Sequence, residues 1–474
     1  MARLALALAA ALASACGAPP AAAAPASACR LPNKQARRDV AIGFPLFPYR
    51  MRATGVVNVS VLFVDFPDAA AERSPAETLA LLAPAAGWYA EVSYGAMRLV
   101  LTPLLETLRM PLNSSAYSFR TVASQRHYLA EATKLAAARK GAAFDFSESE
   151  SVVVLATPRA GRALPNGPAF CATPGQGFKA SGRTFDNRVT RGSDFDFCLH
   201  KWLNHEMGHT MGLVDLYSYG GGPEFGYTGD WSIMGNIAGA GGSYFGWERF
   251  LLGWMPDARV ACVTEPGSST VVLAPLNDAA LGDAPRLAVV RVAPELAVCL
   301  ELRAALGLDR NITQPGVLVY VVDTRLQSGY GPIQVLPLNS SDRTMMSSTL
   351  SAPGAALEYA GVRVELLSIT TGGEALVNVT GPGMQRPSSS PAPPAPAGAA
   401  SAAGSLERAW AYIGGGLAGG LVLIAILVVA AGRLGAWRGG AGALEAGSGL
   451  PEVGGGSPDR QRVEQGDGEF YESL

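Results

Sequence analysis

The stretch HEMGHTMGLVDLY, His205–Tyr217, contains two of the four histidines in this chain of 474 residues. Its pattern predicts a helix over Phe197–Gly212, on which His205 and His209 lie one turn apart on the same face. Two imidazoles placed in this way are near enough to share one metal ion, and neutral imidazole is a good zinc ligand. Glu206 lies beside that ion but off the ligand face, where a general base for an attacking water belongs.

The residues after the second histidine predict a third ligand. Gly212 can adopt a left-handed conformation and end the helix, so the chain turns back and brings Asp215 within reach of the ion. Three protein ligands leave the fourth position of a zinc site open for water, which is the catalytic form. The alternative is a helix whose histidines only cap or pack. His127 and His200 have no such partners and are interpreted as ordinary histidines.

A second motif follows in GDWSIMGN, Gly229–Asn236. Some zinc proteases have a tight methionine turn that forms an apolar floor beneath the metal, and Met234 fits that role. By itself this signal is weak, because a buried methionine usually belongs to the core.

Taken together and in this order, the motifs resemble the immune inhibitor A-like family of zinc metalloproteases. Val214 and Ser218 replace the Pro and Asp that often flank DLY in that family. The resemblance implies a zincin fold, Asp215 in place of the histidine of better-known relatives, and extracellular endopeptidase activity that calcium often supports. Ser193–Phe197 is a weak calcium candidate. The resemblance also covers VLFVDFPD (Val61–Asp68), WYAEVSYGAMRL (Trp88–Leu99), ERFLLGW (Glu248–Trp254) and LELRAALGLD with GVLVYVVDT, up to Thr324.

Regular patterns surround the motif. VVNVSVLFVDF (Val56–Phe66), Met97–Pro103 and Ser151–Thr157 predict strands. SPAE at Ser74–Glu77 predicts a capping box that opens a helix, and Ser124–Gly141 predicts a second helix. After Trp254, short apolar runs separated by Gly, Pro, Asn and Asp predict an all-β, sandwich-like subdomain.

The two ends of the chain predict export and anchoring. Residues 1–24 resemble a secretory signal peptide, and 25–55 is a short N-terminal or propeptide segment. The uncharged run within 409–432 is long enough to cross about 30 Å of hydrocarbon. It predicts one transmembrane helix between a Pro/Ala/Ser stalk, 382–408, and a disordered cytoplasmic tail, 433–474. Small residues in GGGLAGG would let two such helices pack, but they do not by themselves predict a homo-oligomer.

An extracellular location predicts glycans and disulfides. Five sequons predict glycosylation, at Asn58, Asn113, Asn311, Asn339 and Asn378. The disulfide candidates, paired by proximity in the sequence, are Cys171 with Cys198 and Cys262 with Cys299.

Cys29 is then left over and suggests a latency thiol. ACRLPN, Ala28–Asn33, is similar to the cysteine switch of matrix metalloproteases, in which a propeptide thiolate fills the open zinc position. Arg37-Arg38 follows as a processing site. An ordinary disulfide that involves Cys29 is the alternative.

The sequence therefore predicts an α+β protein. A zincin catalytic domain, 56–257, with its active-site helix is followed by a β-rich subdomain, 258–381, the stalk and one transmembrane helix. The predicted function is that of a membrane-anchored (single-pass type I) extracellular zinc endopeptidase acting on proteins or peptides. The alternatives are a non-catalytic adhesion or recognition protein on the same scaffold and a zinc enzyme acting on a non-protein amide or ester. A net charge of −2 does not favour a nucleic-acid partner.

Overall fold

The computed structural model describes most of the chain between Pro25 and Gly381, all of it within the first of two compact units, Met1–Pro396. The described residues are 25–36, 39–119, 121–139, 144–164, 169–170, 177–191, 195–220, 222–278 and 282–381.

The first part is built on a five-stranded sheet with the order β2-β1-β3-β7-β4. The first four of these strands run parallel, and β4 is antiparallel to β7. The bounds are β1 Gly55–Asp65, β2 Met97–Arg109, β3 Ser151–Ala156, β4 Ala169–Phe170 and β7 Arg188–Thr190. The predicted strands at 56–66, 97–103 and 151–157 are thus confirmed.

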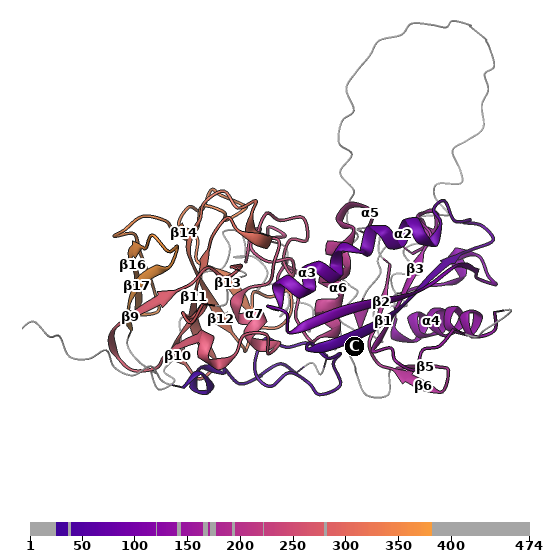
Figure 1. Ribbon diagram of the computed structural model, residues 1–474, viewed down its shortest axis with the longest axis horizontal. Helices are drawn as coiled ribbons and strands as arrows, with labels where there is room; N and C mark the ends of the chain where they lie inside the picture. Colours follow the sequence, from indigo (N-terminus) through magenta and orange to yellow (C-terminus); the bar gives the residue numbers. More distant parts are fainter. Residues whose placement is uncertain are drawn as a thin grey trace, which may run out of the picture. The chain divides into compact units, whose positions relative to one another are not determined.

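Strand β1 lies between β2 and β3, and most of its length is buried on both faces, as is usual for a parallel strand. Val57, Val59 and Val61 belong to one apolar core, which also contains residues of the helices on that side. Leu62 and Val64 face the other core, below α4. Figure 1 shows α2 and α3 on one side of β1 and β2, and α4 on the other.

Two of the helices around the sheet begin at side-chain caps. Ser74 and Glu77 form the expected capping box before α2, Pro75–Leu82. Helix α4, Val122–Ala137, begins two residues earlier than predicted because Thr121 caps it. The other helices are α3 Pro84–Val92, α5 Phe195–Cys198, α6 His200–Thr210 and α7 Gly246–Leu251, with 3₁₀ turns at Ala26–Cys29, Ser114–Ala116, Pro158–Arg162, Asp257–Arg259 and Gly307–Asp309.

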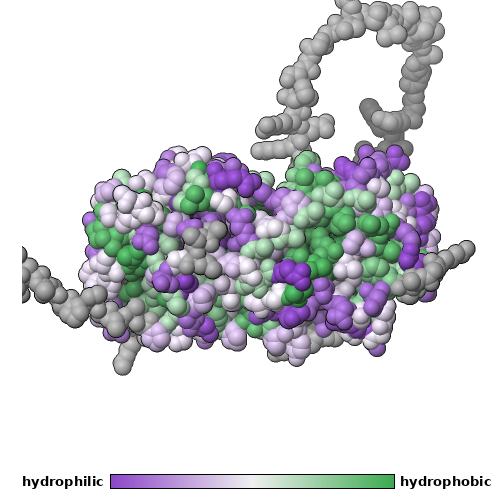
Figure 2. All heavy atoms as spheres, in the orientation of Figure 1, coloured by the Kyte–Doolittle hydropathy of each residue, from purple (hydrophilic) through white to green (hydrophobic). Residues whose placement is uncertain are grey.

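Figure 2 shows hydrophobic residues gathered on the surface over α2 and α3. Alanines account for much of this surface, among them the exposed Ala76, Ala80 and Ala90. The apolar fraction of the composition, 49%, therefore overstates how much of the chain forms a core.

The second part consists of two sheets that bury one apolar core between them. The six-stranded sheet has the order β13-β12-β11-β10-β8, with β14 paired to β12, and the four-stranded sheet has the order β15-β16-β17-β9. The strands are β8 Val260–Val263, β9 Gly267–Leu273, β10 Leu287–Ala293, β11 Leu296–Arg303, β12 Gly316–Asp323, β13 Ile333–Val335, β14 Thr349–Leu350, β15 Ala356–Tyr359, β16 Val362–Ile369 and β17 Ala375–Gly381; a small hairpin, β5 Phe178–Ala180 and β6 Arg183–Phe185, lies earlier in the chain.

The predicted fold class needs correction. In place of an α+β fold with one transmembrane helix, the described residues form mostly small β-sheets with few helices. No helix among the described residues is long and apolar enough to cross a membrane. The strands expected after Trp254 do form, and all eight residues of β11 and of β12 are buried. The helices remain few and short, because the predicted helix Phe197–Gly212 breaks at Leu199, with φ 51°, into α5 and α6. The predicted signal peptide, 1–24, and the predicted stalk, transmembrane helix and tail, 382–474, lie outside the described residues.

Candidate metal centre

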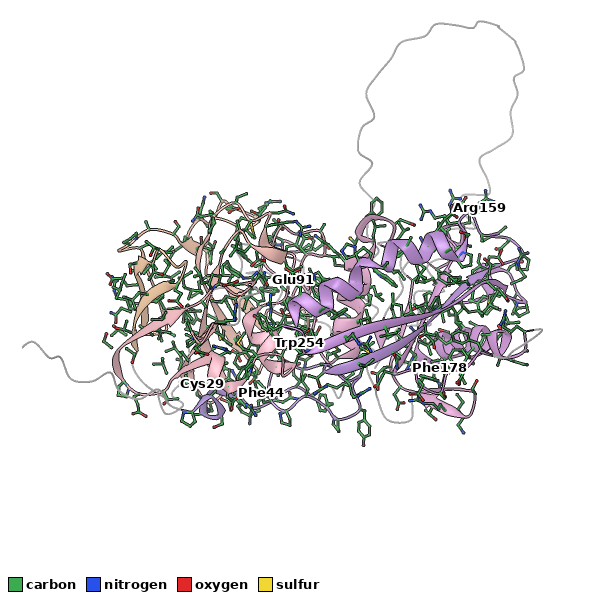
Figure 3. The ribbon with its side chains drawn as sticks, viewed as in Figure 1. Cys29, Phe44, Glu91, Arg159, Phe178 and Trp254 are labelled. Atoms are coloured by element: carbon green, nitrogen blue, oxygen red, sulfur yellow. A yellow bond between two sulfur atoms is a disulfide. The ribbon has the colours of Figure 1, made fainter. Side chains whose placement is uncertain are left out.

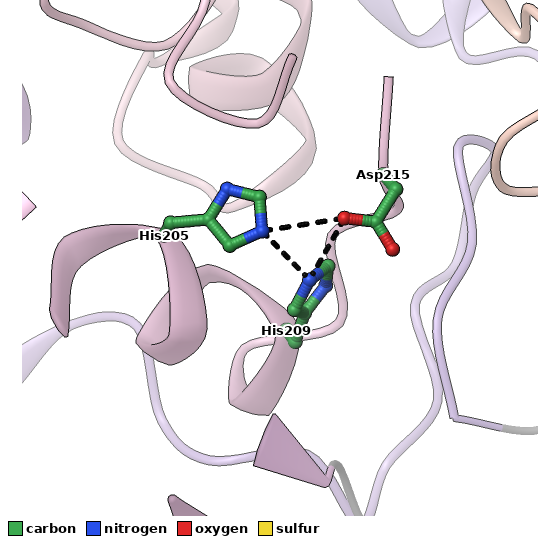
Figure 4. Close-up of side chains that lie close together, drawn as sticks. All are labelled: His205, His209 and Asp215. Carbon is green, nitrogen blue, oxygen red and sulfur yellow. Dashed lines mark hydrogen bonds and ion pairs between the residues drawn. The ribbon is translucent and has the colours of Figure 1, made fainter. Parts of the chain in front are cut away.

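Helix α6 carries both histidines of the motif and is almost entirely buried. It is shorter than predicted, because Leu199, with φ 51°, separates it from α5. His205 Nε2 and His209 Nε2 lie 3.2 Å apart. Figure 4 shows both rings directed at the Asp215 carboxylate.

The hydrogen bonds of the two rings fix which nitrogen can bind a metal. His205 Nδ1 lies 2.7 Å from the carbonyl oxygen of Ile233, and His209 Nδ1 lies 2.9 Å from that of Leu213. A carbonyl oxygen only accepts, so each Nδ1 carries the proton and donates it. Each Nε2 of a neutral ring therefore presents a lone pair to the centre, which is the tautomer that a metal ligand needs.

A glycine turn brings the third residue to the same place. Gly212 has φ 101°, the left-handed region, and the chain reverses there after α6. Asp215 Oδ1 then lies 3.3 Å from His205 Nε2 and 3.1 Å from His209 Nε2. The N-terminal segment supports this turn, because the backbone N–H of Ala41 donates to the Gly212 carbonyl at 2.9 Å.

The three converging atoms fit a metal ion. Two lone pairs and a carboxylate oxygen lie within 3.1–3.3 Å of one another, an arrangement that is repulsive unless a cation or proton lies among them. Ligands about 2.1 Å from a tetrahedral zinc are roughly 3.4 Å apart, which is close to the observed spacing. Among the described residues, no hydrogen-bond donor reaches Asp215 Oδ1, so this buried oxygen is left for the ion.

The charge state of Asp215 also suits a ligand. Burial raises the pKa of its carboxyl group, but the two histidines outweigh that effect and hold the pKa well below its usual range. The group is therefore a carboxylate at neutral pH, as metal binding requires.

Residues distant in the sequence hold Asp215, and sequence analysis did not identify them. Its backbone N–H donates to Ser328 Oγ at 2.9 Å, and its carbonyl oxygen accepts from Gly329 N at 3.0 Å. The Tyr219 hydroxyl donates to Asp215 Oδ2. Of these residues, only Tyr219 lies near Asp215 in the sequence, four residues after it, so only Tyr219 could have been suggested by the local sequence.

Glu206 and Met234 both lie close to the histidines of α6. Glu206 follows His205 on α6 and is only 8% exposed. Burial lowers the pKa of His205, but Asp215 and, after it, the charge of Glu206 raise this pKa above its usual value. Met234 is fully buried under the helix, and a Cβ placed on Gly208 would come within 2.6 Å of its sulfur. The backbone N–H of Leu216 donates to the Met234 carbonyl at 2.9 Å, which joins this turn to the ligand loop.

A buried ionic cluster beneath this turn comes from the second part of the chain. Arg303, on β11, donates to both oxygens of Asp309 and to Glu301 Oε1 at 2.6–2.9 Å. It also donates to the carbonyl oxygen of Trp231 at 3.0 Å, three residues before Met234. Glu248 Oε2 accepts from Ser232 Oγ at 2.9 Å. The β-rich part thereby fixes the segment that orients His205.

Two tyrosines near α6 differ in their positions. Tyr244 is fully buried, and its hydroxyl donates to the Asn204 carbonyl at 2.7 Å, so it supports α6 from within the core. Tyr217 stacks on His205, with ring centroids 6.3 Å apart.

The cysteine prediction is wrong in its pairing. Cys29 forms a disulfide with Cys262, with Cα atoms 5.7 Å apart. Cys262 and Cys299 both lie opposite Val289, so strand β10 separates them by two strand spacings, too far for a disulfide. Cys299 is a buried thiol, and Cys198 lies on α5, while Cys171 lies outside the described residues.

The same disulfide overturns the latency hypothesis for Cys29, because its sulfur is bonded and is not available to a metal. Figure 3 shows Cys29 near Phe44, in the N-terminal segment. That segment packs against α7, where the Phe44 ring lies 5.7 Å from the Trp247 ring and 4.9 Å from the Phe250 ring. It forms part of the fold around the site.

The sequons occupy two kinds of position. Three of the asparagines are exposed and lie outside helices and strands, namely Asn113, Asn311 and Asn339. The other two are half-buried in strands, Asn58 in β1 and Asn378 in β17, where Asn378 Oδ1 accepts from Ser268 Oγ. The exposed three are the better glycan acceptors.

Outside the centre, the remaining polar candidates are engaged elsewhere. His127 is exposed and lies 3.7 Å from Glu131, and His200 is half-buried at the start of α6. In the calcium candidate, Ser193 and Asp194 lie outside the described residues, and the Asp196 oxygens pair with Arg73 and Arg191.

Comparisons with known proteins give little beyond this geometry. No family model matches the chain, so the resemblance to the immune inhibitor A-like family stays a prediction, and no curated protein matches. One similar solved structure is the catalytically inactive OgpA from Akkermansia muciniphila in complex with an O-glycopeptide (glycodrosocin) substrate. It is 9% identical, with a TM-score of 0.23, over 73% of this chain and 96% of that chain. A likeness this slight supports no conclusion about this protein.

Proposed function

We propose that this chain is a zinc-dependent endopeptidase that hydrolyses peptide bonds in proteins or peptides. The observation that carries the proposal is the convergence of His205 Nε2, His209 Nε2 and Asp215 Oδ1 to within 3.1–3.3 Å, with Glu206 beside them. Zinc is the best match for two imidazoles and one carboxylate that leave a coordination position open.

His205, His209 and Asp215 would hold the ion, and Glu206 would move the proton. Zinc, when bound, supplies Lewis acidity, which makes water a better nucleophile and polarises a carbonyl group. The Glu206 carboxylate accepts the proton of the attacking water and later delivers it to the leaving amine. The burial of Glu206 limits its contact with bulk solvent, so it is suited to return that proton to the amine.

We also propose that the described region works outside the cytosol. The Cys29–Cys262 disulfide supports this location, since disulfides persist in oxidising compartments and are rare in the cytosol.

The test compares the full chain with its Glu206→Gln variant. Gln has the same shape but cannot accept the proton, so zinc content should stay at one per chain while peptide cleavage falls at least about 10²-fold. Metal analysis and cleavage of a peptide mixture, read by mass spectrometry, measure both quantities. His127→Gln, an exposed histidine away from the centre, is the control and should keep full activity.

Two outcomes would count against the proposal. Undiminished cleavage by a pure Glu206→Gln preparation would remove Glu206 from the mechanism. A zinc-loaded wild-type protein that cleaves no peptide would favour a binding protein or an enzyme of another substrate class.

A further inference from the structure

Three tyrosine rings lead from the metal centre to the protein surface. The Tyr217 ring centroid is 6.3 Å from that of His205, Tyr219 is 5.5 Å from Tyr217, and Tyr330 is 6.1 Å from Tyr219. Tyr217 and Tyr219 are half-buried, whereas Tyr330 is 50% exposed. The exposed Tyr330 ring thus contacts Tyr219, whose hydroxyl donates to the third ligand, Asp215.

The backbone around Tyr330 lies tightly against its neighbours. Gly329 and Gly331 have φ 75° and 77°. A Cβ on Gly329 would come within 2.2 Å of the Tyr219 ring, and one on Gly331 within 2.8 Å of the Tyr227 ring. Only glycine allows both the backbone conformation and this close approach. The two glycines therefore pack their backbone against the rings of Tyr219 and Tyr227. Tyr330, between them, is the large side chain that the loop presents to solvent.

The same loop is fastened to the metal centre. Ser328 Oγ accepts from the backbone N–H of Asp215, and Gly329 N donates to the Asp215 carbonyl, at 2.9 and 3.0 Å. The Tyr219 hydroxyl donates to Asp215 Oδ2, so its polar atom points toward the metal centre. The Tyr219 ring contacts the rings of Tyr217 and Tyr330. Tyr330 consequently has a fixed position relative to the bond that would be cleaved.

We propose that Tyr330, backed by Tyr219, forms a subsite for an aromatic side chain of the peptide that is cleaved at the metal centre. This inference rests on the proposed function. Aromatic side chains prefer offset or edge-to-face contact with other rings, and Tyr219 already meets Tyr330 at an interplanar angle of 77°. A half-exposed ring held in place by its neighbours loses little freedom when a substrate ring packs on it, which favours binding.

The experiment measures selectivity in turnover and in binding. A synthetic peptide library identifies cleaved sequences, and pairs of peptides that differ only by Phe or Ala at each position flanking the cleaved bond are then compared. For wild type we expect a preference for Phe over Ala at one position of about tenfold in kcat/KM. Tyr330→Ala should reduce that preference to near unity and leave the zinc content unchanged. Tyr330→Phe should retain the preference, because the ring remains.

Binding provides a readout that does not depend on turnover. In the Glu206→Gln background, Tyr330→Ala should raise the Kd of the Phe peptide about tenfold and leave that of the Ala peptide unchanged. The control is Ile369→Ala, which removes a similarly exposed apolar side chain, 43% exposed, on β16. It should change neither value.

The outcomes separate this inference from the proposed function. If wild type cleaves peptides but Tyr330→Ala keeps the Phe preference in turnover and binding, the subsite is refuted and the endopeptidase proposal stands. If zinc-loaded wild type neither cleaves nor binds any peptide of the library, both are refuted.

Discussion

At the scale of single residues, the chemistry of His205 and His209 depends on the group behind each ring. The carbonyl oxygens of Ile233 and Leu213 hold the Nδ1 protons, which leaves both Nε2 atoms free to bind a metal. Asp215 has the corresponding support from Tyr219, whose hydroxyl donates to the carboxylate oxygen that is turned away from the histidines. The ligand spacing alone would not give this orientation.

The Tyr219 hydroxyl is therefore expected to matter for metal binding. Tyr219→Phe removes one hydrogen bond from Asp215 and keeps the ring packing, so zinc affinity should fall about 10-fold. Competition with a chromogenic chelator measures the dissociation constant. Tyr330→Phe, which removes a hydroxyl from the neighbouring ring, is the matched control and should bind zinc as wild type does. Equal affinities of all three proteins would refute this role for Tyr219.

At the scale of elements, the site depends on how helix α6 ends. Gly212, at φ 101°, turns the chain so that Asp215 returns to the face of His205 and His209. Any other residue at this φ is strained, and a Cβ there would also lie 3.3 Å from Arg50 Cδ. The conformation of one glycine thus links the end of the helix to the third ligand.

Gly212→Ala should consequently destabilise the fold by about 1–3 kcal/mol and also weaken zinc binding. Gly253→Ala is a matched control, since Gly253 follows α7 with φ 79° and a Cβ there would meet no atom within 4 Å. Denaturant unfolding and zinc titration separate the two effects. Both variants should lose stability, but only Gly212→Ala should lose zinc affinity. Unchanged zinc binding in Gly212→Ala would show that the turn does not position Asp215.

At the scale of the whole molecule, a buried ionic cluster joins the two parts of the chain. Burial, together with the neighbouring Glu301, raises the pKa of Glu248 to about 7, although hydrogen bonds from Phe245 and Ser232 and the charge of Arg303 oppose this. The folded protein therefore holds a proton that the unfolded chain releases near its ordinary value of 4.5. Stability falls as pH rises between these two values, because the unfolded state binds fewer protons there.

Glu248→Gln should remove this part of the pH dependence. Gln stays neutral, so the stability of the variant relative to wild type should increase by up to about 3 kcal/mol between pH 4.5 and pH 8. Urea unfolding at both values measures the difference. A constant offset between the two proteins across this range would mean that Glu248 does not titrate with a raised pKa.

These contacts explain which parts of the site could be predicted from the sequence. Helical periodicity and the Gly212 turn are local, so the convergence of His205, His209 and Asp215 could be predicted before the structure. The role of Glu206 stays a prediction. Ser328 and Arg303 act on the site through hydrogen bonds that span 113 and 72 residues, and no local pattern indicates them. The disulfide was mispaired for a similar reason, because proximity in sequence does not reveal that β10 lies between Cys262 and Cys299.

The predicted α+β class gave too much weight to helices. The apolar runs after Trp254 were expected to be strands and form them, as β11 and β12 do. The predicted helix Phe197–Gly212, in contrast, is divided at Leu199 into α5 and α6. The capping signal predicted its helix correctly. Ser74 and Glu77 form a specific pair of hydrogen bonds at the start of α2, and a hydropathy pattern does not provide such a signal.

The central claim is that two histidines and one aspartate bind a single zinc ion, and X-ray absorption at the zinc edge tests it most directly. For the protein loaded with one equivalent of zinc, we expect two imidazole nitrogens, one carboxylate oxygen and one water oxygen at about 2.0–2.2 Å, with no sulfur ligand. Asp215→Ala should lose the carboxylate contribution and most of the affinity. A spectrum that is unchanged in Asp215→Ala, or a wild-type protein that does not retain zinc, would contradict the account.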